Sequence, residues 1–71
     1  MTQEELLDLA AEMLTARLAE NDYPIEDGET AESIAAEMHE QSGCFAGVSD
    51  DARTDAVAAA LRARGIEIPR V

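Results

Sequence analysis

The sequence predicts an all-α fold, a small three-helix domain with a short extended C-terminal tail. Three segments carry apolar residues at steps of three and four, which is the period of one helix face. A capping residue precedes each segment, and Gly or Pro follows it. A chain of 71 residues is long enough for one domain only. We therefore predict helices at about residues 3–20, 30–41 and 50–64, within a single helical domain that spans residues 1–71.

The first helix has the clearest signals. Thr2 and Glu5 form the Thr-x-x-Glu pattern of a capping box, in which each side chain binds the other residue's backbone N–H. Asn21, Asp22 and Pro24 favour an end near residue 20. Between these limits the apolar stripe of the helix consists of Leu6, Leu7, Leu9, Ala10, Met13, Leu14 and Leu18.

The second and third helices are marked by their ends. Thr30 or Asp27 caps the second helix, and Ser42-Gly43 stops it. The loop that follows has two apolar anchors, Phe45 and Val48. Ser49 begins the third helix, since two acids follow it and complement the helix dipole, and Gly65 terminates it.

The tail at residues 66–69 alternates apolar and polar residues, which predicts an extended segment. Two placements are open for it. It pairs with residues 24–26 as a single bridge, or its Ile66 and Ile68 side chains close one end of the helical core.

The apolar stripe of the first helix predicts a homodimer. Its Leu and Met residues cover more than half of the helix circumference, whereas the other helices are rich in Ala, which buries little area. A domain of this size buries only about 60% of its unfolded surface. The alternative is that the stripe is the core of a monomer. The predicted dimer face consists of Leu6, Leu7, Leu9, Met13, Leu14 and Leu18.

The charge is strongly acidic. The sequence has 16 Asp and Glu against 5 Arg and no Lys, a net charge of −11 at pH 7. This balance argues against direct binding to nucleic acid or to an anionic membrane, because both need a basic surface. Residues 1–47 hold 12 of the acids and one Arg, whereas residues 48–71 are neutral. The whole imbalance therefore belongs to the first two helices and their connector.

Several of these acids stabilise helix starts, but seven do not, and without basic neighbours they repel one another. We expect them to form a partner-binding acidic face: Glu12, Glu20, Asp22, Glu26, Asp27, Glu37 and Glu40. The expected function is a non-enzymatic protein-binding module, an inhibitor or accessory factor that docks on another protein. Its acidic face imitates nucleic acid and blocks a basic groove, as in phage-encoded inhibitors of host defence (the anti-CRISPR type) or of transcription. In the alternative, the acids only solubilise a homodimeric structural or regulatory accessory protein.

The sequence offers little for catalysis or cofactor binding. Cys44 and His39 are the one nucleophile and base near each other, and a lone Cys is more often a small buried residue. Zinc sites need several Cys or His ligands, and phosphate loops need Lys followed by Ser or Thr. We therefore predict no enzymatic activity, no metal and no cofactor. The single Cys, the acidic N-terminal residues and the lack of a long apolar run predict a cytoplasmic location.

Two stretches carry a resemblance to a known family. Residues 25–28 (Ile-Glu-Asp-Gly), followed by Glu32-Ser33-Ile34, form the first, and residues 45–51 form the second. They resemble acyl carrier proteins, which are short, acidic and helical and carry a modified Ser at the start of their second helix. The resemblance implies modification of Ser33. The sequence departs from the family pattern because Glu rather than Asp precedes Ser33, the loop spacing differs and Ser33 falls inside the predicted helix. An acyl-carrier function is therefore a further alternative.

Overall fold

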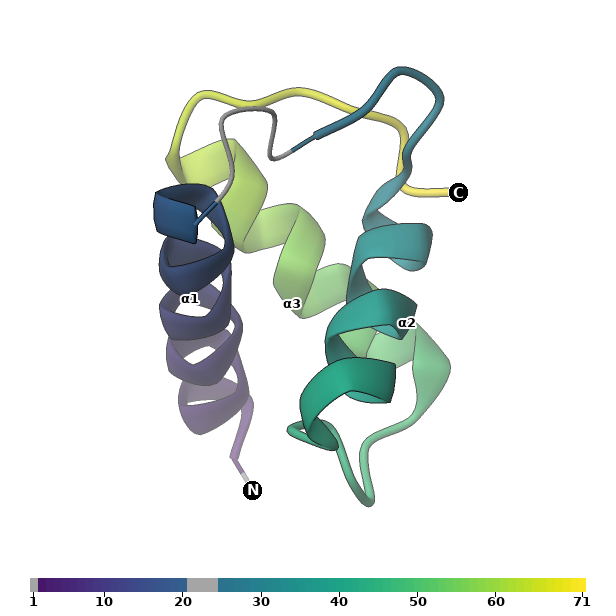
Figure 1. Ribbon diagram of the computed structural model, residues 1–71. Coiled ribbons are helices and arrows are strands. Elements are labelled where there is room, and N and C mark those ends of the chain that lie inside the picture. Colours follow the sequence, from purple (N-terminus) through teal and green to yellow (C-terminus); the bar gives the residue numbers. More distant parts are fainter. Residues whose placement is uncertain (1, 21–24) are drawn as a thin grey trace.

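The computed structural model describes residues 2–20 and 25–71, and this part of the chain forms three helices without strands (Figure 1). The helices are α1 (Gln3–Glu20), α2 (Ala31–Ser42) and α3 (Asp50–Ala63). The predicted all-α, three-helix fold is confirmed. Observed helix bounds differ from the predicted ones by one residue or less, because short-range capping contacts set them.

The N-terminal caps of α1 and α2 are reciprocal. In α1 the Glu5 N–H donates to Thr2 Oγ1 at 3.1 Å, and the Thr2 N–H donates to the Glu5 carboxylate at 3.4 Å, so the predicted capping box is confirmed. In α2 the cap is Thr30 rather than Asp27. Its hydroxyl accepts from the Ser33 N–H at 3.1 Å, while Ser33 Oγ accepts from the Thr30 N–H at 2.9 Å.

The end of α2 and both ends of α3 follow the predicted residues, whereas Asn21, Asp22 and Pro24, predicted to end α1, lie outside the described residues. Gly43 ends α2 with a φ of 66°, a left-handed conformation that favours glycine, and its N–H donates to the His39 carbonyl at 2.7 Å. Ser49 caps α3 and accepts from the Ala52 N–H at 3.2 Å. After α3, Gly65 takes a φ of 77° and turns the chain away from the helix axis.

The third helix lies between the other two (Figure 1). α3 packs against both α1 and α2, whereas α1 and α2 contact each other little in the described residues. Small side chains make this possible, since they let helix backbones approach closely. Those buried on α2 and α3 are Ala31, Ala35, Ala56 and Ala60.

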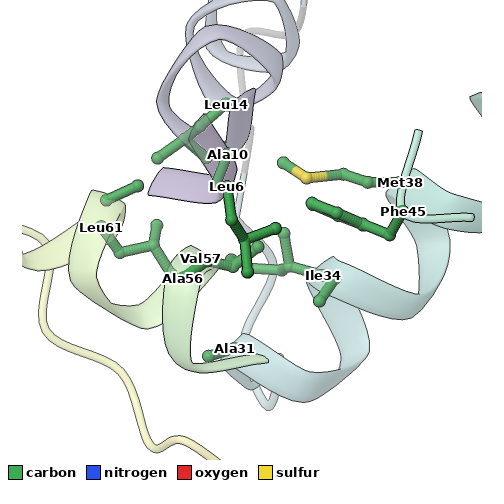
Figure 2. Close-up of a cluster of buried hydrophobic side chains, with 12 residues drawn as sticks. Leu6, Ala10, Leu14, Ala31, Ile34, Met38, Phe45, Ala56, Val57 and Leu61 are labelled. Carbon is green, nitrogen blue, oxygen red and sulfur yellow. The ribbon is translucent and has the colours of Figure 1, made fainter. Parts of the chain in front are cut away.

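Phe45, in the loop between α2 and α3, completes the core. Its side chain is 1% exposed although no helix carries it. Figure 2 shows Phe45 and Met38 pointing toward Leu6 of α1. The loop therefore supplies apolar volume between α1 and α2, which do not pack closely on each other. The predicted loop anchors are confirmed, with Phe45 buried and Val48 half-buried.

Residues 66–71 form an extended segment, which we call the strap, running from the end of α3 to the start of α2 (Figure 1). Ile66 and Ile68 are half-buried against the core, as the second predicted placement requires. The carbonyl oxygens of Pro69 and Arg70 accept hydrogen bonds from the first turn of α2, at 3.0 and 2.9 Å. The strap therefore pairs with the start of α2. The alternative pairing with residues 24–26 includes Pro24, which lies outside the described residues.

Candidate protein-binding surface

Four exposed carboxylates lie on the solvent side of α1, and we call them the acidic row: Glu4, Glu5, Asp8 and Glu12. Glu4, Asp8 and Glu12 follow one another at four-residue steps, about 6 Å along the helix axis. Glu12 lies about 200° around the helix from the buried Ala10, so the row faces away from the core. Within the described part of the chain, none of these carboxylates forms an ion pair.

Arg17 neutralises part of the predicted acidic face. Its guanidinium lies 3.4 Å from Glu29 Oε1 and 3.2 Å from Glu37 Oε1, and the Arg17 side chain is only 15% exposed. These ion pairs join α1 to the connector and to α2. Because 20 residues separate Arg17 from Glu37, the sequence pattern around Glu37 gave no sign of the pair. Glu37 is thus a half-buried ion-pair partner and a poor candidate for contacting another protein.

Of the predicted acidic face, Glu12 belongs to the acidic row, whose other members were assigned to the helix start, and the remaining predicted acids are spread over separate elements. Glu26 and Asp27 in the connector and Glu40 on α2 are exposed, while Asp22 and the Glu20 side chain lie outside the described residues. Among the described residues, no three Asp, Glu, His or Cys side chains come close enough together to hold a metal ion. The structure therefore shows several exposed acidic sites, of which the acidic row is the longest on one helix.

The acids of α3 are all paired. Asp50 binds Arg53 at 3.3 Å, and Asp51 and Asp55 bind Arg70 of the strap at 2.7 and 2.6 Å. The hydrogen bonds that Arg70 donates to Asp51 and to Asp55 raise the pKa of Arg70 further above its ordinary value, so this guanidinium stays charged. Among the described residues up to 47, several carboxylates are thus unpaired, whereas the acids of α3 form ion pairs within the chain.

Two further Arg residues lie at the end of α3. Neither Arg62 nor Arg64 takes part in the ion pairs of the described residues, and Arg64 donates to Thr15 Oγ1 of α1. The end of α3 is therefore basic, in contrast to the first turns of α1.

The predicted dimer face is covered within one chain. Leu6 and Leu14 are core residues, 7% and 0% exposed. Half-buried residues packed against the core make up the rest of the face: Leu7, Leu9, Met13 and Leu18. In the described residues Val71 is the one large exposed apolar side chain. The homodimer was predicted because one chain was expected to leave this face uncovered, and that reason no longer holds. The homodimer itself stays a prediction.

The candidate nucleophiles have local roles. Ser33 lies in the first turn of α2, where its hydroxyl donates to the Thr30 carbonyl at 2.9 Å. The half-buried Cys44 thiol lies 3.9 Å from the Met38 carbonyl. The neighbouring His39 has a buried Nδ1 without a hydrogen-bond partner in the described structure. The hydrogen bonds described here do not join Cys44 to His39.

Across the described residues, no helix is both long and apolar enough to cross a membrane. The chain matches no protein-family model, no curated protein and no solved structure. Its function is therefore inferred from its own residues.

Proposed function

We propose that this protein is a non-enzymatic binding module that docks its acidic surface on a basic surface of a protein partner, as an inhibitor or accessory factor. The observation that carries the proposal is the uneven use of carboxylates. The acids of α3 form ion pairs, whereas the acidic row, Glu26, Asp27 and Glu40 are exposed and unpaired in the described structure.

The acidic row suits this role because a helix holds its charges in place before binding. Three of its carboxylates stand on successive turns about 6 Å apart, so little backbone ordering is needed when a partner docks. Like charges at this spacing repel one another and destabilise the isolated helix by a few tenths of a kcal/mol per pair. A basic partner relieves this repulsion on binding. The same charge pattern supports imitation of a nucleic-acid strand in a basic groove.

The test measures capture of partners from the host proteome at about 50 mM and 500 mM NaCl. Electrostatic docking predicts binding that falls steeply with salt, and mimicry further predicts that added nucleic acid displaces the chain. Two variants locate the contact. The triple variant Glu4→Gln, Asp8→Asn, Glu12→Gln removes three charges from α1.

The matched variant Glu26→Gln, Asp27→Asn, Glu40→Gln removes three charges from the connector and α2. Both variants have the same net charge, so a difference between them identifies the docking surface rather than a general charge effect. Circular dichroism confirms that each is folded. Binding that is insensitive to salt and unchanged in both variants contradicts the proposal, and would favour a contact through apolar residues.

A further inference from the structure

We propose that residues Pro69–Arg70 of the strap form a latch, a contact that detaches from the first turn of α2 while the three helices stay folded. Its opening depends on ionic strength. The inference is independent of the docking proposal, because it uses neither the acidic row nor Glu26, Asp27 or Glu40. It follows from how the strap is attached and from what remains when it is detached.

Two kinds of contact hold the latch, and Arg70 makes both. Its backbone carbonyl, with that of Pro69, accepts from the Glu32 and Ala31 N–H groups. These groups belong to the first turn of a helix, where backbone donors have no partner inside the helix. The Arg70 guanidinium at the same time binds Asp51 and Asp55 of α3. One residue therefore links the start of α2 to α3.

The ionic contacts of the latch face water. The side chains of Arg70, Asp51 and Asp55 are 40%, 84% and 60% exposed. Salt screens exposed ion pairs of this kind strongly, since the Debye length falls to about 3 Å at 1 M salt. Arg70 itself keeps its charge, so ionic strength controls the contact.

Most of the core lies away from the latch; Ala31, 0% exposed at the start of α2, is the core residue beside it. All of the buried core residues lie in the helices or at Phe45, whereas Ile66 and Ile68 of the strap are only half-buried. A hollow also lies between the strap and α3, lined on its apolar side by Ala58, Leu61, Ile66 and Ile68. The strap is therefore incompletely packed against the helix beneath it.

The start of α2 also survives detachment. The capping box between Thr30 and Ser33 satisfies the Ser33 N–H from within the chain, and the Ile34 N–H donates to the Thr30 carbonyl at 3.0 Å. Opening the latch exposes the Ala31 and Glu32 N–H groups to water and leaves the next donors paired. Detachment therefore changes the hydrogen bonding of the Ala31 and Glu32 amides and of no later amide in this turn.

Hydrogen–deuterium exchange of backbone amides, followed by NMR, tests the latch. We expect Arg70→Gln to speed exchange at Ala31 and Glu32 by at least about threefold, the size expected for exposed charge pairs acting together. The Ser33 and Ile34 amides serve as internal controls and keep their rates. Arg64→Gln, which removes an Arg outside both the ion pairs described and the hollow, is the matched control and leaves all four rates unchanged.

A second variant and a salt titration protect the test against misfolding. Asp51→Asn with Asp55→Asn breaks the ion pairs from the α3 side and should reproduce the effect of Arg70→Gln. In the wild-type chain, 1 M NaCl should speed the same two amides, and Arg70→Gln should abolish this salt response. Unchanged rates at Ala31 and Glu32 in both variants overturn the proposal. An equal acceleration of Ser33, Ile34 and the amides of α3 also overturns it, because the opening would then be global unfolding.

Discussion

Replacing Phe45 with Ala removes the largest core side chain that no helix carries. The side chain is 1% exposed and lies toward Leu6 and Met38, so its loss leaves a void between α1 and α2. Large-to-small changes of buried Phe cost about 3–5 kcal/mol. A chain of 71 residues has a total stability of about 4–11 kcal/mol at typical values per residue. Phe45→Ala should therefore remove about a quarter or more of the free energy of unfolding.

The measurement is urea denaturation followed by circular dichroism at the helix band. With an m value of about 1 kcal/mol per molar urea, the expected loss moves the midpoint down by about 3–5 M, or unfolds the chain without denaturant. Phe45→Leu keeps most of the apolar volume and should cost less than about 1.5 kcal/mol.

Val71→Ala serves as the control for apolar truncation at the surface. Val71 is 70% exposed, so its truncation should leave the midpoint unchanged. A midpoint for Phe45→Ala within about 0.5 M of wild type would refute the reasoning, since it would mean that α1 and α2 cover each other without the loop.

Three further predictions concern charge and capping. Because the chain carries a net charge of −11, NaCl should raise its melting temperature, as measured by circular dichroism. The increase should be smaller in the triple variant of the acidic row, and a melting temperature that falls with added salt would contradict this prediction. Arg17→Met should cost about 1–2 kcal/mol in urea denaturation, between the values for exposed and buried pairs, and added Glu29→Gln and Glu37→Gln should restore part of the loss. Failure of these two changes to restore stability would show that Arg17 acts through its packing. Thr30→Ala should cost about 1 kcal/mol, and Asp27→Ala much less, by the same measurement; equal costs would count against Thr30 as the cap.

The acyl-carrier alternative has a separate test. Coexpression with a phosphopantetheinyl transferase, followed by intact-mass measurement, should leave the mass unchanged, because the Ser33 hydroxyl is engaged in the capping box with Thr30. A mass increase that Ser33→Ala abolishes would establish the carrier function.

The helices were predictable because the signals that set their ends are short-range. Thr2 with Glu5, Ser49 with its following acids, and Gly43 each act within four residues, so the sequence shows them directly. The choice between Thr30 and Asp27 was open from the sequence. Ser33 decides it in the structure by completing a reciprocal cap with Thr30.

Contacts between distant residues were not predictable in the same way. Arg17 reaches Glu37 across 20 residues, and Arg70 reaches Asp51 across 19. Neither pairing leaves a periodic pattern, since each depends on how the helices pack. For a related reason the sequence left open whether the α1 stripe is covered within one chain. Alanines let α3 approach closely, and the loop residue Phe45 fills the space left between α1 and α2.

The central position of α3 has a consequence for synthesis on the ribosome. α1 and α2 bury their apolar faces mainly against a helix that begins only at residue 50. While residues 1–49 emerge, these two helices contact each other little, and most of the stability of a helix in a protein comes from the packing of its apolar face. Most of the tertiary packing can therefore form only after residues 50–63 have left the exit tunnel. Until then, the mutual repulsion of the acids in residues 1–47 keeps the exposed leucines of nascent chains apart.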